Sequence, residues 1–256
     1  MNENRHIPMT SESKRSFLQE LVALATGFGL ANTAQAEPES AHFQPNRRPG
    51  LKGKRFGMLV DMRKCIGCQA CTVSCSVENL PPIGQFRTTV LQYEIHEEGA
   101  REPAMVSLPR LCNHCDNPPC VPVCPVQATF QRTDGIVLVD NERCVGCGYC
   151  VQACPYDARF INHETQTADK CTFCEHRLEA GLLPACVESC VGGARVIGDL
   201  NDPGSEINQR MAQHQDEIKV LKPDMQTSPR VFYIGLPDAF VHGVDGQASV
   251  RLLAEH

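Results

Sequence analysis

Cysteine is the residue whose number and spacing carry the chemistry of this chain. Sixteen of the 256 residues are cysteines, and they form four groups of four. The groups are Cys65, Cys68, Cys71 and Cys75; Cys112, Cys115, Cys120 and Cys124; Cys144, Cys147, Cys150 and Cys154; and Cys171, Cys174, Cys186 and Cys190. Thiolate sulfur is a soft metal ligand, so what these cysteines bind decides what the protein does.

The spacing within the groups indicates iron–sulfur ligation. Groups one and three follow the run C-x2-C-x2-C-x3-C of [4Fe–4S] sites, and the Pro125 and Pro155 that follow groups two and three complete the bacterial ferredoxin pattern. A proline there also suits the first turn of a helix. Three close ligands can surround one cluster only if the backbone curls around it, and Gly67 and Gly146 allow that approach without a Cβ. The pattern predicts four [4Fe–4S] clusters.

Two other uses of the cysteines stay open at this point. An even number of cysteines suggests disulfides in an exported protein, and residues 1–36 resemble an export signal. Two cysteines on one tight loop are, however, poorly placed to bond each other. Pairs of the form C-x2-C also bind zinc, although a structural zinc site takes only two such pairs. Iron–sulfur ligation is favoured because all four groups agree.

The fourth cysteine of each group is expected to bind a different cluster from the first three, as in two-cluster ferredoxins. Only 19 residues separate groups two and three, and groups one and four bracket them, so we predict exchange within these two pairs. Quartet A is then Cys65, Cys68, Cys71 and Cys190; quartet B is Cys112, Cys115, Cys120 and Cys154; quartet C is Cys144, Cys147, Cys150 and Cys124; quartet D is Cys171, Cys174, Cys186 and Cys75.

An internal repeat indicates the elements that position these ligands. A shift of 79 residues aligns Met58–Asp61 with Val137–Asp140 and superimposes the cysteines of groups one and three, so a short strand precedes each cluster loop. Shifts of 30 and 36 residues align a second set of positions. These are Ala128, Ala158 and Ala194, the last two followed by Arg159 and Arg195. Duplication of a small ferredoxin unit explains both repeats.

The remaining pattern predicts an α+β fold. Strands are expected over 86–93, 104–108, 135–140 and 231–234, and a helix over 204–221. The fold is predicted to consist of tandem bacterial-ferredoxin-like [4Fe–4S] modules, with short strands, cluster loops and a C-terminal helix–strand extension that packs over them. The chain has no tryptophan and only 5% aromatic residues. Metal–sulfur bonds are therefore expected to stabilise it more than apolar burial does.

The chain divides into four segments by composition. Residues 1–36 read as a twin-arginine-like signal peptide, with Lys14 and Arg15 before an apolar run and Ala34–Ala36 as the cleavage pattern. Residues 37–56 read as a flexible linker with little regular structure. A four-cluster domain follows over 57–200, in which groups 65–75 and 171–190 pair and groups 112–124 and 144–154 pair. Residues 201–256 form the extension. The longest apolar stretch, Leu21–Ala31, is too short to span a bilayer.

Three stretches carry a resemblance to a known family. They are 111–130 (LCNHCDNPPCVPVCPVQATF), 149–171 and 182–193. They resemble the iron–sulfur B subunits of tetrathionate reductases, among the electron-transfer subunits of molybdopterin oxidoreductases of the dimethyl sulfoxide and polysulfide reductase type. The resemblance runs from about Gly57 to Phe240, and the Lys14–Arg15 signal is similar too.

The resemblance implies a role and partners. Four [4Fe–4S] clusters would relay electrons from a polytopic membrane subunit that oxidises quinol to a molybdopterin catalytic subunit that reduces tetrathionate to thiosulfate, in anaerobic respiration. The complex would lie in the periplasm at the cytoplasmic membrane. Some related nitrate-reducing subunits have tryptophan in place of the third cysteine of group three and hold a three-iron cluster. Here that residue is Cys150, so four irons are expected in every cluster.

No catalytic residue is expected in the chain itself, so we predict a non-catalytic subunit with no direct small-molecule substrate. His114, His163 and His176 are expected to be exposed or capping residues. Lys64, Arg143 and Lys170 each precede the first cysteine of a group. They either raise cluster potentials or lie on solvated loops.

Other functions are weighed against this one. A net charge of −6 argues against nucleic-acid binding. The alternatives are the same subunit of a polysulfide, thiosulfate or sulfoxide reductase, and a free multicluster ferredoxin. The export signal and the C-terminal extension argue against the free ferredoxin, because they fit a fixed complex better.

Overall fold

The computed structural model describes residues 46–95 and 104–243. The signal peptide predicted over 1–36 and residues 37–45 of the predicted linker lie outside the described residues. The strands are β1 (Arg47–Arg48), β2 (Phe56–Asp61), β3 (Thr88–Ile95), β4 (Ala104–Leu111), β5 (Thr129–Arg132), β6 (Val137–Val139), β7 (Arg159–Ile161), β8 (Ala168–Lys170), β9 (Arg195–Asp199), β10 (Ile218–Lys219) and β11 (Val231–Ile234). The helices are α2 (Ala70–Asn79), α3 (Tyr149–Gln152), α4 (Glu175–Glu179), α5 (Ala185–Glu188) and α6 (Glu206–Gln213), and short 3-10 turns cover Met62–Lys64, Gln215–Glu217, Pro223–Met225 and Asp238–Phe240.

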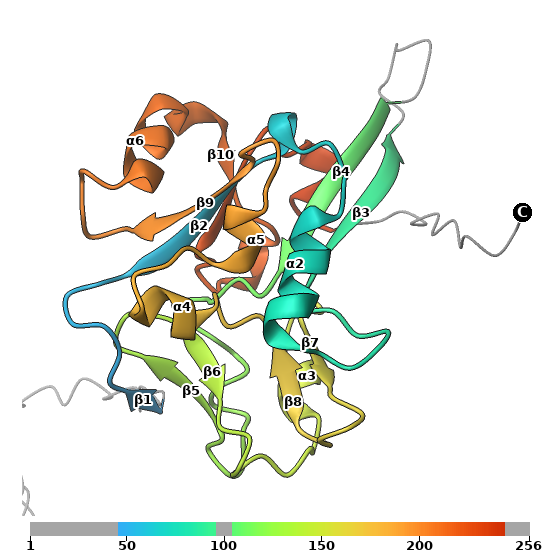
Figure 1. Ribbon diagram of the computed structural model, residues 1–256, viewed down its shortest axis with the longest axis vertical. Coiled ribbons are helices and arrows are strands. Elements are labelled where there is room, and N and C mark those ends of the chain that lie inside the picture. Colours follow the sequence, from blue (N-terminus) through green and yellow to red (C-terminus); the bar gives the residue numbers. More distant parts are fainter. Residues whose placement is uncertain (1–45, 96–103, 244–256) are drawn as a thin grey trace, which may run out of the picture. The chain divides into compact units, whose positions relative to one another are not determined.

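A four-stranded sheet in the order β10-β11-β2-β9 supports the cysteine loops (Figure 1). Every residue of β2 is buried, and successive side chains point to opposite faces of a strand. Met58 and Val60 therefore join the core that contains the cysteines, whereas Leu59 packs with Ile207 of α6 on the other face. The sheet thus separates the metal-binding side of the molecule from α6.

The C-terminal segment contributes a strand to the interior of this sheet. The strand predicted over 231–234 is confirmed as β11, which lies parallel to β2 with Val231 opposite Met58. The expected packing over the cluster core is seen at Tyr233 and Phe240, which are buried in the same core as the cysteines, and the segment also forms part of the sheet. Because β2 leads directly into the first cysteine group, β11 helps to position that group.

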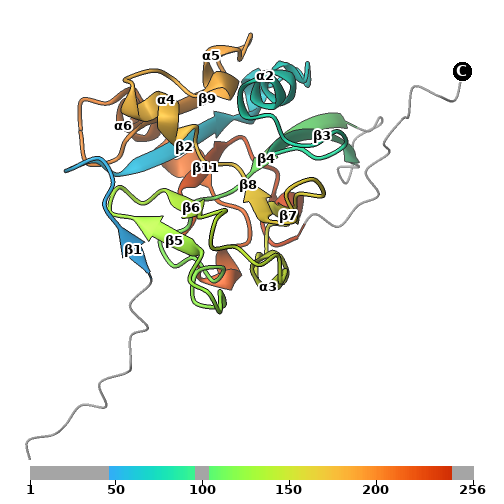
Figure 2. The same cartoon turned by 60° about the horizontal axis from the view of Figure 1, so that its bottom comes forward.

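Three hairpins complete the described fold. Strands β3 and β4 pair along their full length, β5 pairs with β6, and β7 pairs with β8, all antiparallel. Figure 2 shows β1 alongside β5, with β6 on the other side of β5. The predicted strands over 86–93, 104–108 and 135–140 correspond to β3, β4 and β6, and a strand does precede each of the repeated cluster loops.

Three predicted local structures differ from those observed. The helix expected over 204–221 ends at Gln213, because Ile218 and Lys219 pair with β11 instead. The expected linker contains β1 and the start of β2. Arg48 holds β1 in place by an ion pair of 2.9 Å to Asp140 and by lying 3.9 Å over the ring of Phe130.

The third difference concerns the prolines. No helix begins at Pro125 or Pro155; turns lead from there into β5 and β7. Short helices instead carry the third cysteine of three groups. They are α2 with Cys71, α3 with Cys150 and α5 with Cys186.

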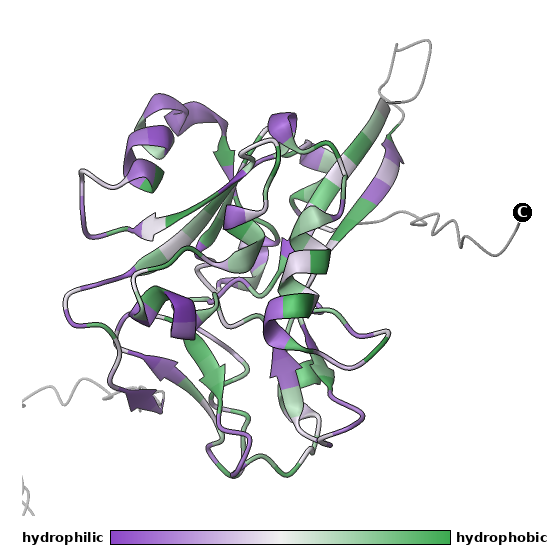
Figure 3. Cartoon of the chain, viewed as in Figure 1, coloured by the Kyte–Doolittle hydropathy of each residue, from purple (hydrophilic) through white to green (hydrophobic). Residues whose placement is uncertain are grey.

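The main core mixes apolar side chains with cysteines. Tyr233, Phe173 and Leu108 are almost fully buried in the same cluster as five buried cysteines, Cys71, Cys112, Cys115, Cys171 and Cys186. Figure 3 shows β6 as hydrophobic along its length and β1 as hydrophilic. Among the residues described, no helix combines the length and the apolar character needed to cross a bilayer.

Candidate metal centres

Quartet A surrounds a pocket beside β2 and α2. Cys65, Cys68, Cys71 and Cys190 all line it. Burial raises the pKa of Cys65, and negative charge on Cys71 and Cys190 raises it further, as expected for thiols that face one another. Cys190, the last cysteine of the chain, therefore lines the same pocket as the first three.

Quartet D surrounds a second pocket, which Cys75, Cys171, Cys174 and Cys186 line. The Asn79 side-chain amide lies 3.6 Å from the sulfurs of both Cys75 and Cys174. Burial, followed by the charges of Cys186 and Cys174, raises the pKa of Cys75 to about 12. Because Cys75 lies on α2 after Cys71, one helix supplies sulfur to both pockets.

Quartet B is buried except for its fourth cysteine. Cys112, Cys115 and Cys120 are buried, and the half-buried Cys154 packs against the core that contains Cys112 and Cys115. Burial raises the pKa of Cys115 to about 12, and charge on Cys112, Cys120 and Cys154 contributes in the same direction. Cys154, the fourth cysteine of group three, thus faces the first three cysteines of group two.

Quartet C is the one whose predicted membership rests on sequence alone. Cys144 and Cys150 pack in one apolar cluster with Cys120 and Val121. The Ala168 N–H donates to the Cys144 sulfur at 3.3 Å. The remaining grouping, Cys124 and Cys147 with these two, stays a prediction.

The alanine repeat has a structural meaning at the fourth cysteines. The N–H of Ala128 donates to the Cys124 sulfur and that of Ala194 to the Cys190 sulfur, both at 3.2 Å. Hydrogen bonding from the Ala158 backbone likewise lowers the pKa of Cys154, against the larger effect of burial. The repeated alanine therefore presents its N–H to the sulfur four residues before it, and such bonds to sulfur tune iron–sulfur clusters.

The donor set fits iron–sulfur clusters. All sixteen cysteines are free, so none of them forms a disulfide. Within 46–95 and 104–243, no three histidine, cysteine or acidic side chains converge closely enough to hold a single metal ion. A [4Fe–4S] cluster instead takes one thiolate at each iron, so its ligands surround it, as quartets A and D surround their pockets.

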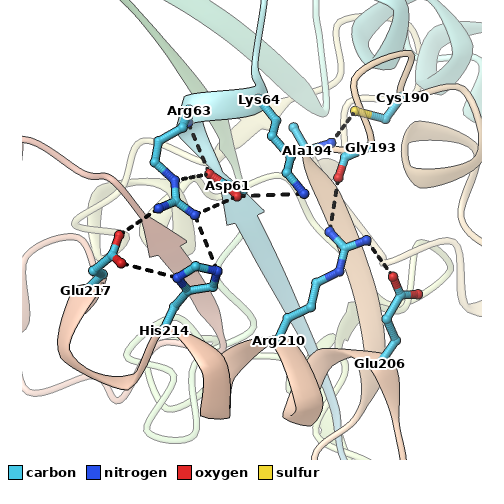
Figure 4. Close-up of polar contacts among 10 residues, drawn as sticks. All are labelled: Asp61, Arg63, Lys64, Cys190, Gly193, Ala194, Glu206, Arg210, His214 and Glu217. Atoms are coloured by element: carbon cyan, nitrogen blue, oxygen red, sulfur yellow. Dashed lines mark hydrogen bonds and ion pairs between the residues drawn. The ribbon is translucent and has the colours of Figure 1, made fainter.

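Figure 4 shows polar contacts near Cys190 of quartet A, one set around Asp61 and one around Arg210. Lys64 reaches Asp61 at 4.0 Å, and the Arg63 guanidinium bonds to the same carboxylate at 2.9 Å. Arg210 of α6 donates to the carbonyl of Gly193 at 3.3 Å, next to the Ala194 N–H that donates to the Cys190 sulfur. Arg210 thus ties the loop that carries Cys190 to α6. The contacts of Asp61 hold η1, the 3-10 turn Met62–Lys64, against the end of β2.

The two cluster-loop glycines have a left-handed backbone, with φ of +70° at Gly67 and +67° at Gly146. The close approach at Gly146 is to another part of the protein. A Cβ there would lie 2.2 Å from the carbonyl oxygen of Gln166, in the turn between β7 and β8. That glycine is needed because the loop packs tightly against this turn.

His114 is buried, contrary to the expected exposed or capping position. Its Nδ1 accepts a hydrogen bond of 3.0 Å from the Val137 N–H, and its ring lies 3.8 Å from that of Phe173. Burial, and then the positive charge of Lys170, holds its pKa well below the usual value, so the ring is neutral. His163 is exposed, as expected. His176 is also exposed and lies 2.8 Å from Glu78.

The basic residues before the cysteine groups differ in their surroundings. Lys64 and Arg143 are exposed, whereas Lys170 is only 1% exposed. Two buried arginines, Arg159 and Arg195, are 4% and 3% exposed, and neither was predicted from the sequence to lie at a metal site. The signal that could have found them was the alanine–arginine pair shared by two repeats.

Comparisons with known proteins agree with these sites. Two family models described as 4Fe-4S dicluster domains match residues 64–128 and 103–200. The chain is 66% identical over 243 residues to the tetrathionate reductase B subunit of Salmonella typhimurium, covering 95% of this chain and 96% of the relative. It is 45% identical to the tetrathionate reductase B subunit of Archaeoglobus fulgidus, covering 72% and 84%. It is 40% identical to a putative dimethyl sulfoxide reductase iron-sulfur B subunit of Halobacterium salinarum, covering 70% and 78%.

The match to the Salmonella protein covers 95% of the chain, and the two family models together include every cysteine group. The chain holds [4Fe–4S] clusters in dicluster domains, and its role is electron transfer rather than catalysis. It belongs to the family of tetrathionate reductase B subunits, the iron–sulfur subunits of reductase complexes.

Proposed function

We propose that this chain is the electron-transfer subunit of a respiratory tetrathionate reductase and carries four [4Fe–4S] clusters. Electrons would come from a polytopic membrane subunit that oxidises quinol and would pass to a molybdopterin subunit that reduces tetrathionate to thiosulfate. The observation that carries the proposal is the placement of cysteines from different groups around shared pockets, in a chain 66% identical to the Salmonella protein. The ligands of the four clusters would be quartets A, B, C and D.

The quartets support a relay because neighbouring ones influence each other. Burial raises the pKa of Cys186 in quartet D, and Cys71 of quartet A is among the charges that raise it further. The pKa of Cys171 in quartet D is raised by burial first and also by Cys112 of quartet B. Cys120 of quartet B packs in one apolar cluster with Cys150 of group three. These neighbours support the order A, D, B, C.

The ends of this order are the parts open to solvent. Cys68 and Cys147 are the two exposed cysteines, and they belong to quartets A and C. Their neighbours Ile66 and Val145 are apolar and 68% and 64% exposed. A relay needs one cluster near each partner, so we assign electron entry and exit to these two ends.

Export as a folded protein belongs to the same proposal. The twin-arginine-like signal over 1–36 would carry the folded subunit, with its clusters already inserted, to the periplasmic side of the cytoplasmic membrane. Replacing the Lys14–Arg15 pair should leave the protein inside the cell. Continued export of that variant would overturn the assignment of the signal.

Purification of the complex from its native host under anaerobic conditions tests the function. We expect a molybdenum subunit to copurify, about 16 irons per chain of this protein, and tetrathionate reduction driven by a quinol. About eight irons would remove two of the clusters. A complex that reduces dimethyl sulfoxide, polysulfide or thiosulfate but not tetrathionate would favour the alternative that the 40% identity to a putative sulfoxide reductase protein supports. Isolation as a single chain would favour a free ferredoxin.

A further inference from the structure

Three buried cations lie among the cysteines. Lys170, Arg195 and Arg159 are 1%, 3% and 4% exposed. In the part of the chain that the structure describes, none of the three makes an ion pair with a carboxylate. A buried charge without a partner is strongly unfavourable, so something else must compensate it.

Other buried arginines of the same protein are paired in the usual way. Arg132 bonds to Asp134 at 2.7 Å, and Arg230 bonds to Asp116. Buried arginines elsewhere in the fold therefore face carboxylates. The three unpaired cations instead face the sulfurs of the proposed cluster ligands or backbone carbonyls next to them.

Arg195 lies between quartets A and D. It lines the pocket that quartet A surrounds, and its guanidinium donates to the Thr88 hydroxyl at 2.9 Å. Thr88 also lines the pocket that quartet D surrounds. One guanidinium thus lies between the two pockets.

Lys170 lies between quartets D and B. Its ammonium donates to the carbonyl of Cys171 in quartet D at 2.7 Å and also to the carbonyl of Val137. Val137 packs in one apolar cluster with Cys120 of quartet B. The carbonyls hold the ammonium in place but leave its positive charge without compensation.

Arg159 lies between quartet B and group three. Its guanidinium donates to the Cys120 sulfur at 3.0 Å and to the Thr129 hydroxyl at 3.3 Å. Cys120 packs in one apolar cluster with Cys150. Cys150 is a group-three ligand, so this cation also faces two sites.

We propose that Arg195, Lys170 and Arg159 are the counter-charges of the cluster relay, one at each junction of the order A, D, B, C, and that each raises the reduction potential of the clusters on both sides. The inference rests on the proposed function. A [4Fe–4S] core with four thiolates goes from a charge of roughly −2 to −3 when it gains one electron. A fixed positive charge stabilises the reduced form more, and a cation at a junction acts on two clusters at once.

The test is an EPR-monitored redox titration of the holo-complex with single variants. Arg195→Gln should lower the potentials of clusters A and D, Lys170→Met those of D and B, and Arg159→Gln those of B and C. The other two potentials should stay unchanged in each case. Arg159→Lys, which keeps the charge, should restore the wild-type potentials.

Arg143→Gln is the matched control, because it removes an exposed charge one residue before a cysteine ligand. It should shift no potential by as much as the buried variants do. If a buried variant fails to assemble its clusters, Thr129→Asp and Thr88→Asp keep the arginine and pair it with a carboxylate. They should lower the potentials of the same two clusters as Arg159→Gln and Arg195→Gln.

The outcomes separate this inference from the proposed function. A wild-type complex without four titrating clusters would refute the four-cluster relay itself. Four clusters in the wild type, with shifts in the buried variants no larger than in Arg143→Gln or spread equally over all four, would overturn the counter-charge assignment alone.

Discussion

Gly146 and Gly148 lie in one cluster loop and offer a paired test of how that loop is held. Both have a left-handed backbone, with φ of +67° and +77°. A Cβ at Gly146 would lie 2.2 Å from the Gln166 carbonyl oxygen, whereas a Cβ at Gly148 would meet nothing within 4 Å. Replacing each glycine by alanine therefore imposes the same backbone demand, and only Gly146→Ala adds a clash.

The magnitude follows from these two contributions. A left-handed backbone costs a residue with a Cβ about 1–2 kcal/mol. The lower entropy of the unfolded chain offsets about 0.4–1 kcal/mol of that. Overpacking adds about 1–3 kcal/mol, at Gly146 only. Gly146→Ala should therefore melt about 2–12 °C below Gly148→Ala in a domain of this size.

The clash should also reach the metal site. Two residues beyond Gln166, the Ala168 N–H donates to the Cys144 sulfur at 3.3 Å. Moving the Gln166 carbonyl away from a Cβ displaces this donor. We expect Gly146→Ala to lose the cluster of quartet C and about four of 16 irons, and Gly148→Ala to keep all of them.

The assay compares the two variants as purified holo-proteins. Iron and acid-labile sulfide are counted per chain, and melting is followed at one fixed scan rate because unfolding of such proteins is often irreversible. Equal melting temperatures and equal iron contents in the two alanine variants would show that the contact with the Gln166 carbonyl does not hold this loop. The loop would then be held by its cysteines alone, without the contact to the turn between β7 and β8.

Two further changes test the ligand exchange and the core. Cys75→Ser should alter the EPR signal of the cluster bound by quartet D, because Cys75 lines that pocket; loss of only the quartet A cluster would contradict the exchange. Tyr156→Phe removes a buried hydrogen bond of 2.5 Å between the phenol and the Thr227 hydroxyl. It should lower the free energy of unfolding by about 1 kcal/mol, roughly 2–4 °C in melting temperature, without loss of iron. An unchanged melting temperature would show that this bond contributes nothing measurable.

Local features were predictable to the extent that neighbouring residues decide them. The strands before the repeated cluster loops depend on short segments, and they match the structure. The helix over 204–221 was too long because pairing between Lys219 and Tyr233 overrides the local helical pattern. The residues of β10 by themselves do not indicate that they will pair with β11.

Local sequence likewise does not predict whether a basic residue near a metal site is buried or exposed. Lys64 and Lys170 each directly precede the first cysteine of a group, so the sequence treats them alike. In the structure Lys64 is exposed and lies near Asp61, while Lys170 is buried among backbone carbonyls. Burial depends on which elements pack over a side chain, and these elements come from distant parts of the chain.

The spacing of the cysteines was enough to predict which cofactor this protein binds. Ligands two or three residues apart are brought together by the chain's own geometry, so the cysteine spacing alone indicated [4Fe–4S] clusters. Which cations are buried near the quartets, such as Lys170 but not Lys64, depended on the tertiary structure. The structure also places Cys190 in the pocket that Cys65, Cys68 and Cys71 line. Such contacts join distant parts of the chain. The pairing of β2 with β9 and β11, for example, places Met58 next to Ile197 and Val231.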